Sequence, residues 1–120
     1  LGRLSGRVLS VERYRTLCEL ARQRLETLGI GDVVVRHADG ARPLASEGPF
    51  DRIVVWAAFD SYPRAFVEML STGGVMVAPV GPGEGEQELM RLAKVGSRFE
   101  REDIGKVRLQ PITPGMAATL

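Results

Sequence analysis

The sequence predicts an α/β fold with a mainly parallel sheet and an antiparallel hairpin near its carboxyl end. The continuous apolar run at residues 33–35, and the one at 53–58 within the predicted strand 52–58, are typical of strands that are covered on both faces of a parallel sheet. An amphipathic pattern separates the first of these runs from an earlier apolar run at residues 7–13. Strand, helix and strand then follow one another within about thirty residues, which is the spacing of a βαβ unit.

Composition limits the class of protein. The chain has 120 residues and no internal repeat or linker, so residues 1–120 are expected to form a single domain or part of one. Sixteen basic and fifteen acidic residues give a net charge of +1, which does not favour a nucleic-acid or membrane partner. No apolar run has the length of a membrane span. Since no signal-peptide pattern opens the chain, the expected location is cytoplasmic.

The first predicted strand ends on Glu12 and leads directly into an amphipathic helix. The apolar stripe of this helix has i, i+3, i+4, i+7 spacing and comprises Tyr14, Leu17, Cys18, Ala21, Leu25 and Leu28. Gly29 supplies the stop signal at its carboxyl end. The next strand begins at Val33 and leads through His37 to the pair Asp39-Gly40.

Residues 41–50 contain two prolines and are expected to be a loop before the third strand at 52–58. Asp60 or Ser61 is expected to cap a short helix that has Pro63 in its first turn. The side chains expected to face inward from this helix are Ala65, Phe66, Met69 and Leu70. Gly73-Gly74 is expected to end the helix and to precede a fourth strand at 75–80.

The pattern then changes to antiparallel. A turn at 81–86 precedes two short runs, Leu89–Val95 and Arg98–Glu102, which read as a hairpin around Gly96-Ser97. Residues 89–92 fit one helical turn equally well, and periodicity does not separate the two alternatives over so few residues. Residues 107–110 alternate as an edge strand would. The tail from Gly115 to Leu120 is expected to be mobile.

Glu12 and Asp39 form the most informative pair of side chains. Both follow parallel-type strands in adjacent positions, so both are expected at the same edge of the sheet, where ligands of open α/β folds bind. One carboxylate could accept hydrogen bonds from two ribose hydroxyls, and the other from an adenine amino group. Gly40 would leave room for the base. The alternative is that these are solvated acidic residues at strand ends, but the pair together favours a nucleotide-type ligand.

Other candidate motifs are weaker. The run Gly81-x-Gly83-x-Gly85 lacks the Lys-Ser/Thr of a phosphate loop and carries glutamates that would repel an anion. His37 is the only histidine, so a metal site is not expected. No nucleophile elbow is present, and no catalytic residue is assigned. Trp56 would ordinarily be a core residue, but its position at a strand end also suits a wall of the ligand site.

Several segments together resemble the protein-L-isoaspartate O-methyltransferase family, which are class I S-adenosylmethionine-dependent enzymes. The similar segments are Arg7-Val-Leu-Ser-Val-Glu-Arg13, His37-Ala-Asp-Gly40, Pro49-Phe-Asp-Arg-Ile-Val-Val-Trp-Ala-Ala58 and Leu70-Ser-Thr-Gly-Gly-Val-Met-Val-Ala-Pro-Val-Gly81. The likeness continues through Gln87, Phe99-Glu-Arg-Glu102 and Val107-Arg-Leu-Gln-Pro111. It extends over essentially the whole chain and corresponds to the carboxyl-terminal two thirds of the family.

The resemblance implies a Rossmann-like methyltransferase sheet that binds S-adenosylmethionine. Glu12 would bind the ribose, Asp39 and Gly40 would contact the adenine, and Arg13 and Trp56 would complete the cofactor-binding set. The substrates implied are proteins or peptides that contain L-isoaspartyl residues, whose α-carboxylate the family methylates in protein repair. Since a carboxylate is already nucleophilic at neutral pH, positioning rather than acid–base catalysis would supply most of the acceleration.

Two departures from the family put the activity in question. The first strand and its glycine-rich loop lie outside this sequence, so the fold is expected to be truncated at the amino terminus and the chain inactive alone. Trp56 stands where the family usually has a small residue. Strands at 8–11 and 52–57 would each expose an edge, which would allow homo-oligomerisation. The competing hypotheses are a non-catalytic interaction or oligomerisation module and a methyltransferase that acts on another substrate.

Overall fold

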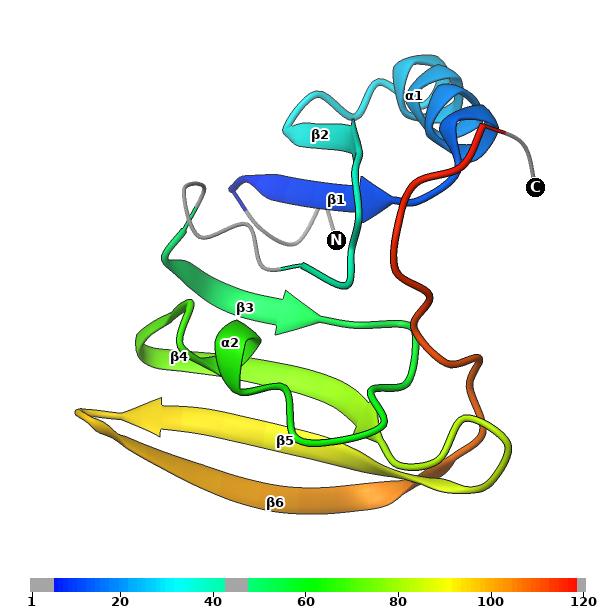
Figure 1. Cartoon of the computed structure of the whole chain (residues 1–120). Helices are drawn as coiled ribbons and strands as arrows, with labels where there is room; N and C mark the ends of the chain where they lie inside the picture. The colour runs from blue at the N-terminus through cyan, green and yellow to red at the C-terminus, as the bar shows by residue number, and fades with distance from the viewer. Residues whose placement is uncertain (1–5, 43–47, 119–120) are drawn as a thin grey trace. The chain divides into compact units, whose positions relative to one another are not determined.

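A computed structural model describes residues 6–42 and 48–118 and shows an α/β fold (Figure 1). The described strands form two sheets, one with the order β1-β2 and one with the order β3-β4-β5-β6. The described residues also form two compact units. Residues 6–42 and 113–118 belong to the first unit, and residues 48–112 belong to the second.

The first unit contains the βαβ arrangement that the sequence predicts. Strand β1 (Val8–Glu12) pairs in parallel with β2 (Val33–His37), and helix α1 (Arg15–Thr27) connects them. The register aligns Val8 with Val33 and Glu12 with His37. Parallel strands cannot be joined by a tight turn, and the helical connection provides the return path across the sheet.

Helix α1 ends as its sequence suggests. Gly29 has a φ of 69°, the left-handed conformation that favours glycine after a helix. Cys18 is fully buried, but Leu28 is 61% exposed because the helix has already ended at Thr27. Coverage of β2 on both faces is also wrong for the described residues, since Val35 is buried and Val34 is 57% exposed.

The second unit holds a mixed sheet. Its strands are β3 (Phe50–Val54), β4 (Leu70–Val80), β5 (Gln87–Val95) and β6 (Arg98–Val107). β3 and β4 are parallel, and the other two pairs are antiparallel. The predicted hairpin around Gly96-Ser97 is therefore confirmed, and the alternative of a helical turn at 89–92 is wrong.

Two strand boundaries differ from the prediction. β3 ends at Val54 rather than reaching Ala58; beyond it, Ala58 and Phe59 form only isolated bridges, to Pro111 and Val80. The predicted edge strand at 107–110 is also wrong, because Val107 is the last residue of β6. The backbone of Leu109 instead bonds the side chain of Gln87.

The segment between β3 and β4 differs most from expectation. Helix α2 spans only Arg64–Val67. Its N-cap residue is Pro63 and no side chain caps it, so the prediction of a cap by Asp60 or Ser61, with Pro63 in the first turn, is wrong. Gly73-Gly74 lies inside β4 rather than before it. A Cβ on Gly74 would stand 2.7 Å from the carbonyl oxygen of Ser71, so only glycine fits this close approach of the backbone.

One apolar cluster forms the core of the second unit. Its fully or nearly fully buried side chains are Phe59, Val67, Leu70, Met76, Ala78, Met90 and Leu92. The alternation along β4 and β5 places Met76, Ala78, Met90 and Leu92 on one face of the sheet. Leu70 contributes from β4 rather than from the predicted helix, and Ala65 is exposed. Within residues 6–42 and 48–118, neither helix has the length and apolar character that crossing a bilayer requires.

Candidate functional site

The carboxyl ends of β1 and β2 carry four of the five site residues that the sequence predicts. Glu12 is the last residue of β1 and Arg13 follows it, while Asp39 and Gly40 follow β2. The register pairs Glu12 with His37, two residues before Asp39. Parallel strands end at the same edge of a sheet, which is where ligands of open α/β folds bind.

The Glu12 carboxylate is held close to the backbone that follows it. Its Oε1 accepts a hydrogen bond of 3.1 Å from the backbone N–H of Tyr14. The guanidinium of Arg13 lies over the Tyr14 ring, with Cζ 5.0 Å from the ring centroid. The Arg13 Nε is buried and has no hydrogen-bond partner among the described residues. A ligand acceptor at this place would therefore satisfy a group that is costly to leave unpaired.

Among the described residues, two backbone N–H groups donate to the Asp39 carboxylate and one donates to that of Glu12. Backbone N–H groups of Gly115 and Ala41 donate to the Asp39 carboxylate, the latter at 2.9 Å, and Arg42 Nε lies 3.4 Å from Oδ2. The Gly115 bond is the largest cause of the lowered pKa of Asp39, followed by the Ala41 bond and then by the charges of Arg42 and Arg13, against partial desolvation. Asp39 is therefore held as an anion.

The carboxyl-terminal segment, residues 113–118, lies against these strand ends, so the expected mobility is wrong for residues 115–118. Ala117 forms a parallel bridge with Tyr14, and its N–H donates to the Arg13 carbonyl at 2.9 Å. The carbonyls of Ala117 and Ala118 accept from the backbone N–H groups of Arg15 and Thr16 at 3.0 and 3.1 Å. Residues 119–120 lie outside the described residues.

His37 joins the same segment to β2. Its Nε2 lies 2.9 Å from the Arg13 carbonyl and 3.0 Å from the Ala117 carbonyl, so this nitrogen carries the proton and donates to both. Ala117 and Gly115 contribute backbone groups, not their own side chains, to these contacts. No residue-type signal in the sequence could therefore have placed these two residues at the site.

Gly40 lies beside open space. A Cβ built on Gly40 would meet only Val11 Cγ1, at 3.9 Å, which is ordinary contact. Packing among the described residues therefore does not require glycine at this position. That Gly40 leaves room for a flat ring such as a base stays a prediction.

Trp56 belongs to the second unit and lies two residues beyond β3. Its side chain is 78% exposed, so it is not a core residue of this unit. The large exposed ring follows a parallel strand and is free to contact a ligand or another chain.

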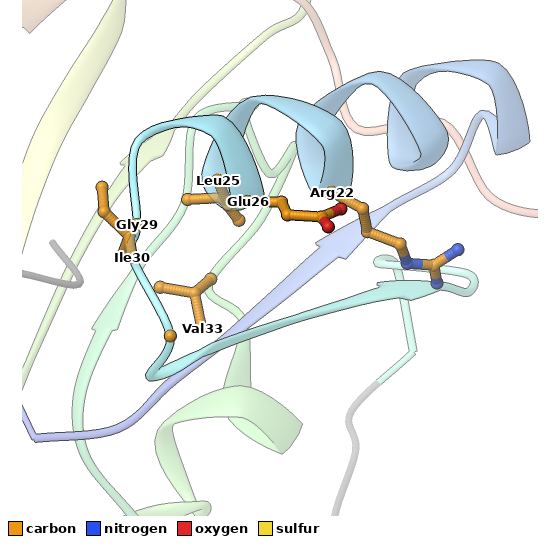
Figure 2. A pocket seen from close by; sticks show the side chains of 7 residues that line it. Arg22, Leu25, Glu26, Gly29, Ile30 and Val33 are labelled. Carbon is orange, nitrogen blue, oxygen red and sulfur yellow. The ribbon is translucent and has the colours of Figure 1, made fainter.

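Two hollows of the described surface lie away from the paired carboxylates. A hollow of about 450 Å³ is lined by Arg22, Leu25, Glu26, Gly29, Ile30, Gly31 and Val33 (Figure 2). Val33 begins β2, so this hollow lies at the opposite end of the strand from Asp39. A second, of about 320 Å³, lies between Gly83–Gly85 and Arg108–Pro111. The predicted hydrogen-bonding groups, Glu12 and Asp39, therefore lie away from both of these hollows.

Comparisons with known proteins show which family the chain belongs to. The family model described as protein-L-isoaspartate(D-aspartate) O-methyltransferase matches residues 2–117. Protein-L-isoaspartate O-methyltransferases of Bradyrhizobium sp. (strain ORS 278) and Rhizobium meliloti (strain 1021) are 44% and 42% identical over 120 residues. The match spans 100% of this chain in both cases, but only 56% and 59% of the relatives' own lengths.

Two solved structures have the same fold. One is a Plasmodium falciparum protein in complex with S-adenosyl-L-homocysteine, described as a protein-L-isoaspartate O-methyltransferase; it is 20% identical, with a TM-score of 0.76. The match covers 89% of this chain and 52% of the Plasmodium falciparum chain. The other is a protein-L-isoaspartate O-methyltransferase, 25% identical with a TM-score of 0.79, which covers 92% of this chain and 35% of its own.

The two parallel pairs and the antiparallel hairpin are thus those of a Rossmann-like methyltransferase fold. With the family model matched over residues 2–117, the chain belongs to the protein-L-isoaspartate O-methyltransferase family. It spans a little over half the length of the curated relatives that it matches.

Proposed function

We propose that this chain forms the nucleoside-binding part of a protein-L-isoaspartate O-methyltransferase that uses S-adenosylmethionine. The observation that carries the proposal is the pair Glu12 and Asp39 at adjacent strand ends, in a chain that matches the family over residues 2–117. Glu12 would accept hydrogen bonds from the ribose hydroxyls. Asp39 would accept from the adenine amino group, beside the open space at Gly40.

The chemistry asks little of the protein's acid–base groups. Bound S-adenosylmethionine would supply a methyl group attached to a positively charged sulfur. The isoaspartyl α-carboxylate would form the new oxygen–carbon bond as the carbon–sulfur bond breaks, and the electron pair would stay with sulfur. This carboxylate is ionised at neutral pH, so no base is needed. Glu12 and Asp39 would contribute by fixing the nucleoside and hence the direction of the methyl group.

Arg13 and Trp56 complete the proposed cofactor contacts. The buried Nε of Arg13 lacks a partner among the described residues and could donate to an acceptor on the ligand. Trp56 would provide an apolar wall with its exposed ring. Trp56 is the only tryptophan in the chain, so a change in intrinsic fluorescence on ligand addition reports on this residue alone.

Isothermal titration of S-adenosylhomocysteine into the 120-residue chain tests the cofactor site. We expect binding that Glu12→Ala weakens by about tenfold or more, the effect of losing hydrogen bonds to a charged group. Glu19→Ala removes an exposed glutamate of α1 and is the matched control, which should bind as the unsubstituted chain does. Absence of binding by a folded chain would refute a working cofactor site in these residues.

The sheet edges favour a second candidate, a module that associates with itself. In the described sheets β1 has only β2 as a neighbour, and β3 has only β4. The N–H of Val55 donates to β4, so the alternation of the backbone directs the N–H of Val54 away from β4. Exposed edges of this kind pair readily with another chain.

Light scattering behind size-exclusion chromatography tests this candidate across a range of concentrations. Val54→Pro removes an outward N–H without removing a bond to β4, and it should lower the dimer fraction if β3 forms the contact. Ile53→Val is the control on the same strand. A monomer at every concentration would exclude self-association, while titration with S-adenosylhomocysteine decides the cofactor site independently.

We also propose that residues 1–120 are one partial domain of a longer parent protein. The parent protein would act on isoaspartyl-containing proteins or peptides, and it would be located in the cytoplasm. Methyl-ester formation on an isoaspartyl peptide by the parent protein tests the activity. Transfer to the corresponding aspartyl peptide would point instead to a methyltransferase with another substrate. Fractionation of cells that make the parent protein tests the location.

A further inference from the structure

Gln87 is a buried polar side chain of the second unit, only 1% exposed at the start of β5. A buried amide is destabilising unless its hydrogen bonds are made. Gln87 Oε1 accepts from the backbone N–H of Leu109 at 2.8 Å. Its Nε2 lies 3.1 Å from the Leu109 carbonyl, 2.9 Å from that of Pro82 and 3.2 Å from that of Gly85.

This amide replaces a strand at the point where the sheet ends. The backbone of Gln87 pairs with Val107, the last residue of β6. Two residues further on, the Gln87 side chain bonds both the N–H and the carbonyl of Leu109, as the peptide group of a neighbouring strand would. The pairing of β5 with the chain beyond β6 is thereby continued by a side chain.

The same amide holds the turn at 82–85 against this segment. Two of its acceptors, Pro82 and Gly85, belong to the turn. A Cβ on Gly83 would stand 2.7 Å from Pro111 Cβ, so the turn and the segment are in close contact. Neither could shift without breaking a bond to Gln87 or opening that contact.

The segment fixed in this way holds the chain that follows β3. Ala58 donates its N–H to the Gln110 carbonyl at 2.8 Å and accepts from the Ile112 N–H at 2.9 Å. Phe59 is held on its other side, by bonds with Pro79 and Gly81 at 3.0 and 2.8 Å. Trp56 lies two residues before Ala58, at the carboxyl end of a strand parallel to β4.

We infer that Gln87 is a positioning residue: through Leu109 to Ile112 it fixes Ala58, and with it the segment that presents Trp56 to a ligand. The hydrogen bonds of Leu109, Gln110 and Ile112 support the part of this inference that concerns Ala58. The part that concerns a ligand at Trp56 rests on the proposed function. Gln87 acts through the backbone and does not itself touch the ligand.

The test uses the 120-residue chain and its single tryptophan. Gln87→Met keeps a side chain of similar length but removes the amide, which leaves buried carbonyls unpaired. We expect the amide protons of Ala58 and Ile112 to exchange about tenfold faster, and acrylamide quenching of Trp56 fluorescence to change with them.

Leu92→Val is the matched control, since Leu92 is equally buried in the same strand and makes no contact with the 109–112 segment through a polar group. It should lower the Tm without changing Trp56 quenching. Gln87→Asn keeps an amide, one methylene shorter, and should restore part of the protection. Equal effects of Gln87→Met and Leu92→Val on Trp56 would reduce Gln87 to a general stabilising role and overturn the inference.

A measurement on the unsubstituted chain decides the case if Gln87→Met does not fold. Leu109, Ala58 and Ile112 should then open together, with equal free energies of opening from amide exchange. If the Ala58 amide is protected from exchange about tenfold less than the Leu109 amide, Gln87 does not fix the segment after β3, and the inference is refuted. If neither the unsubstituted chain nor any variant binds S-adenosylhomocysteine, the proposed function is refuted. Amide hydrogen exchange still tests the role of Gln87 in that case.

Discussion

The guanidinium of Arg22 donates two hydrogen bonds to the carbonyl oxygen of Val35, at 3.2 Å from Nε and 2.7 Å from Nη2. Just before and just after β2, the Asp32 carbonyl and the Ala38 N–H bond to β1, so the alternation of the backbone directs the Val35 carbonyl to the other edge. Figure 2 shows the Arg22 side chain extending from α1 along β2. A helix side chain thus satisfies an edge group that no described strand pairs.

Replacing Arg22 with alanine should lower the free energy of unfolding by about 1 kcal/mol, because the Val35 carbonyl loses a charged donor and regains only water. Arg22→Lys should recover part of this, since an ammonium cannot form the same two-pronged contact. Urea unfolding measures both. Gln23→Ala, at the neighbouring exposed position of α1, should have little effect.

Asp39 predicts a pH dependence of stability. Its folded pKa is lowered by the Gly115 and Ala41 N–H groups and by nearby arginines, so ionised Asp39 stabilises the fold above its unfolded pKa. That contribution is lost as the pH falls through the folded pKa. In urea unfolding between neutral and acid pH, Asp39→Asn should flatten the decline of stability at the acid end. Asp60→Asn, on the exposed surface, serves as the control; an unchanged slope in Asp39→Asn would contradict the prediction.

Deleting residues 113–120 should destabilise the first unit. The backbone N–H groups of Arg15 and Thr16, at the start of α1, would lose the carbonyls of Ala117 and Ala118, and no side-chain cap replaces them. We expect a loss of about 2 kcal/mol, the sum expected for a few net backbone hydrogen bonds. Thermal unfolding followed by circular dichroism measures it.

Deleting only residues 119–120 is the matched control, because it leaves the contacts of Ala117 and Ala118 in place. If both deletions unfold at the temperature of the uncut chain, the contacts of Ala117 and Ala118 contribute nothing to stability. A loss confined to the longer deletion supports them.

Cys18 should react slowly while the chain is folded. Burial is the main cause of its raised pKa, partly opposed by the charge of Arg22, so little thiolate is present at neutral pH. Its side chain is also fully buried. Labelling with a disulfide reagent should therefore follow unfolding and accelerate in urea. Labelling as fast as that of a free cysteine in native buffer would show that α1 opens readily.

The sequence predicted the carboxyl ends of β1 and β2 but not the carboxyl-terminal segment that contacts them. Glu12 and Asp39 follow runs whose periodicity is clear, and the parallel register of β1 and β2 follows from a helix between two buried-type strands. The partners of Asp39 and His37 on the carboxyl-terminal segment are backbone groups of Gly115 and Ala117. Such contacts depend on the path of the chain, so residue type does not reveal them.

Tertiary structure also overrode local patterns in the second unit. The run Leu70-Ser71-Thr72-Gly73-Gly74 lacks alternation and was predicted to be a helix end, but pairing with β3 makes it the start of β4. Gln87 is polar, yet it is buried and its amide bonds backbone groups of Pro82, Gly85 and Leu109. Long-range pairing decides both cases.

The division of the chain into two units has a consequence for the order of folding. Every described residue of the second unit, 48–112, is synthesised between the two parts of the first. The contact of His37 with Ala117 joins residues 80 positions apart, so the first unit cannot close until the ribosome has made nearly all of this sequence. The entropy lost in closing that loop rises only with the logarithm of its length. On the ribosome, therefore, the second unit should become resistant to proteases before α1 does, although α1 is translated first.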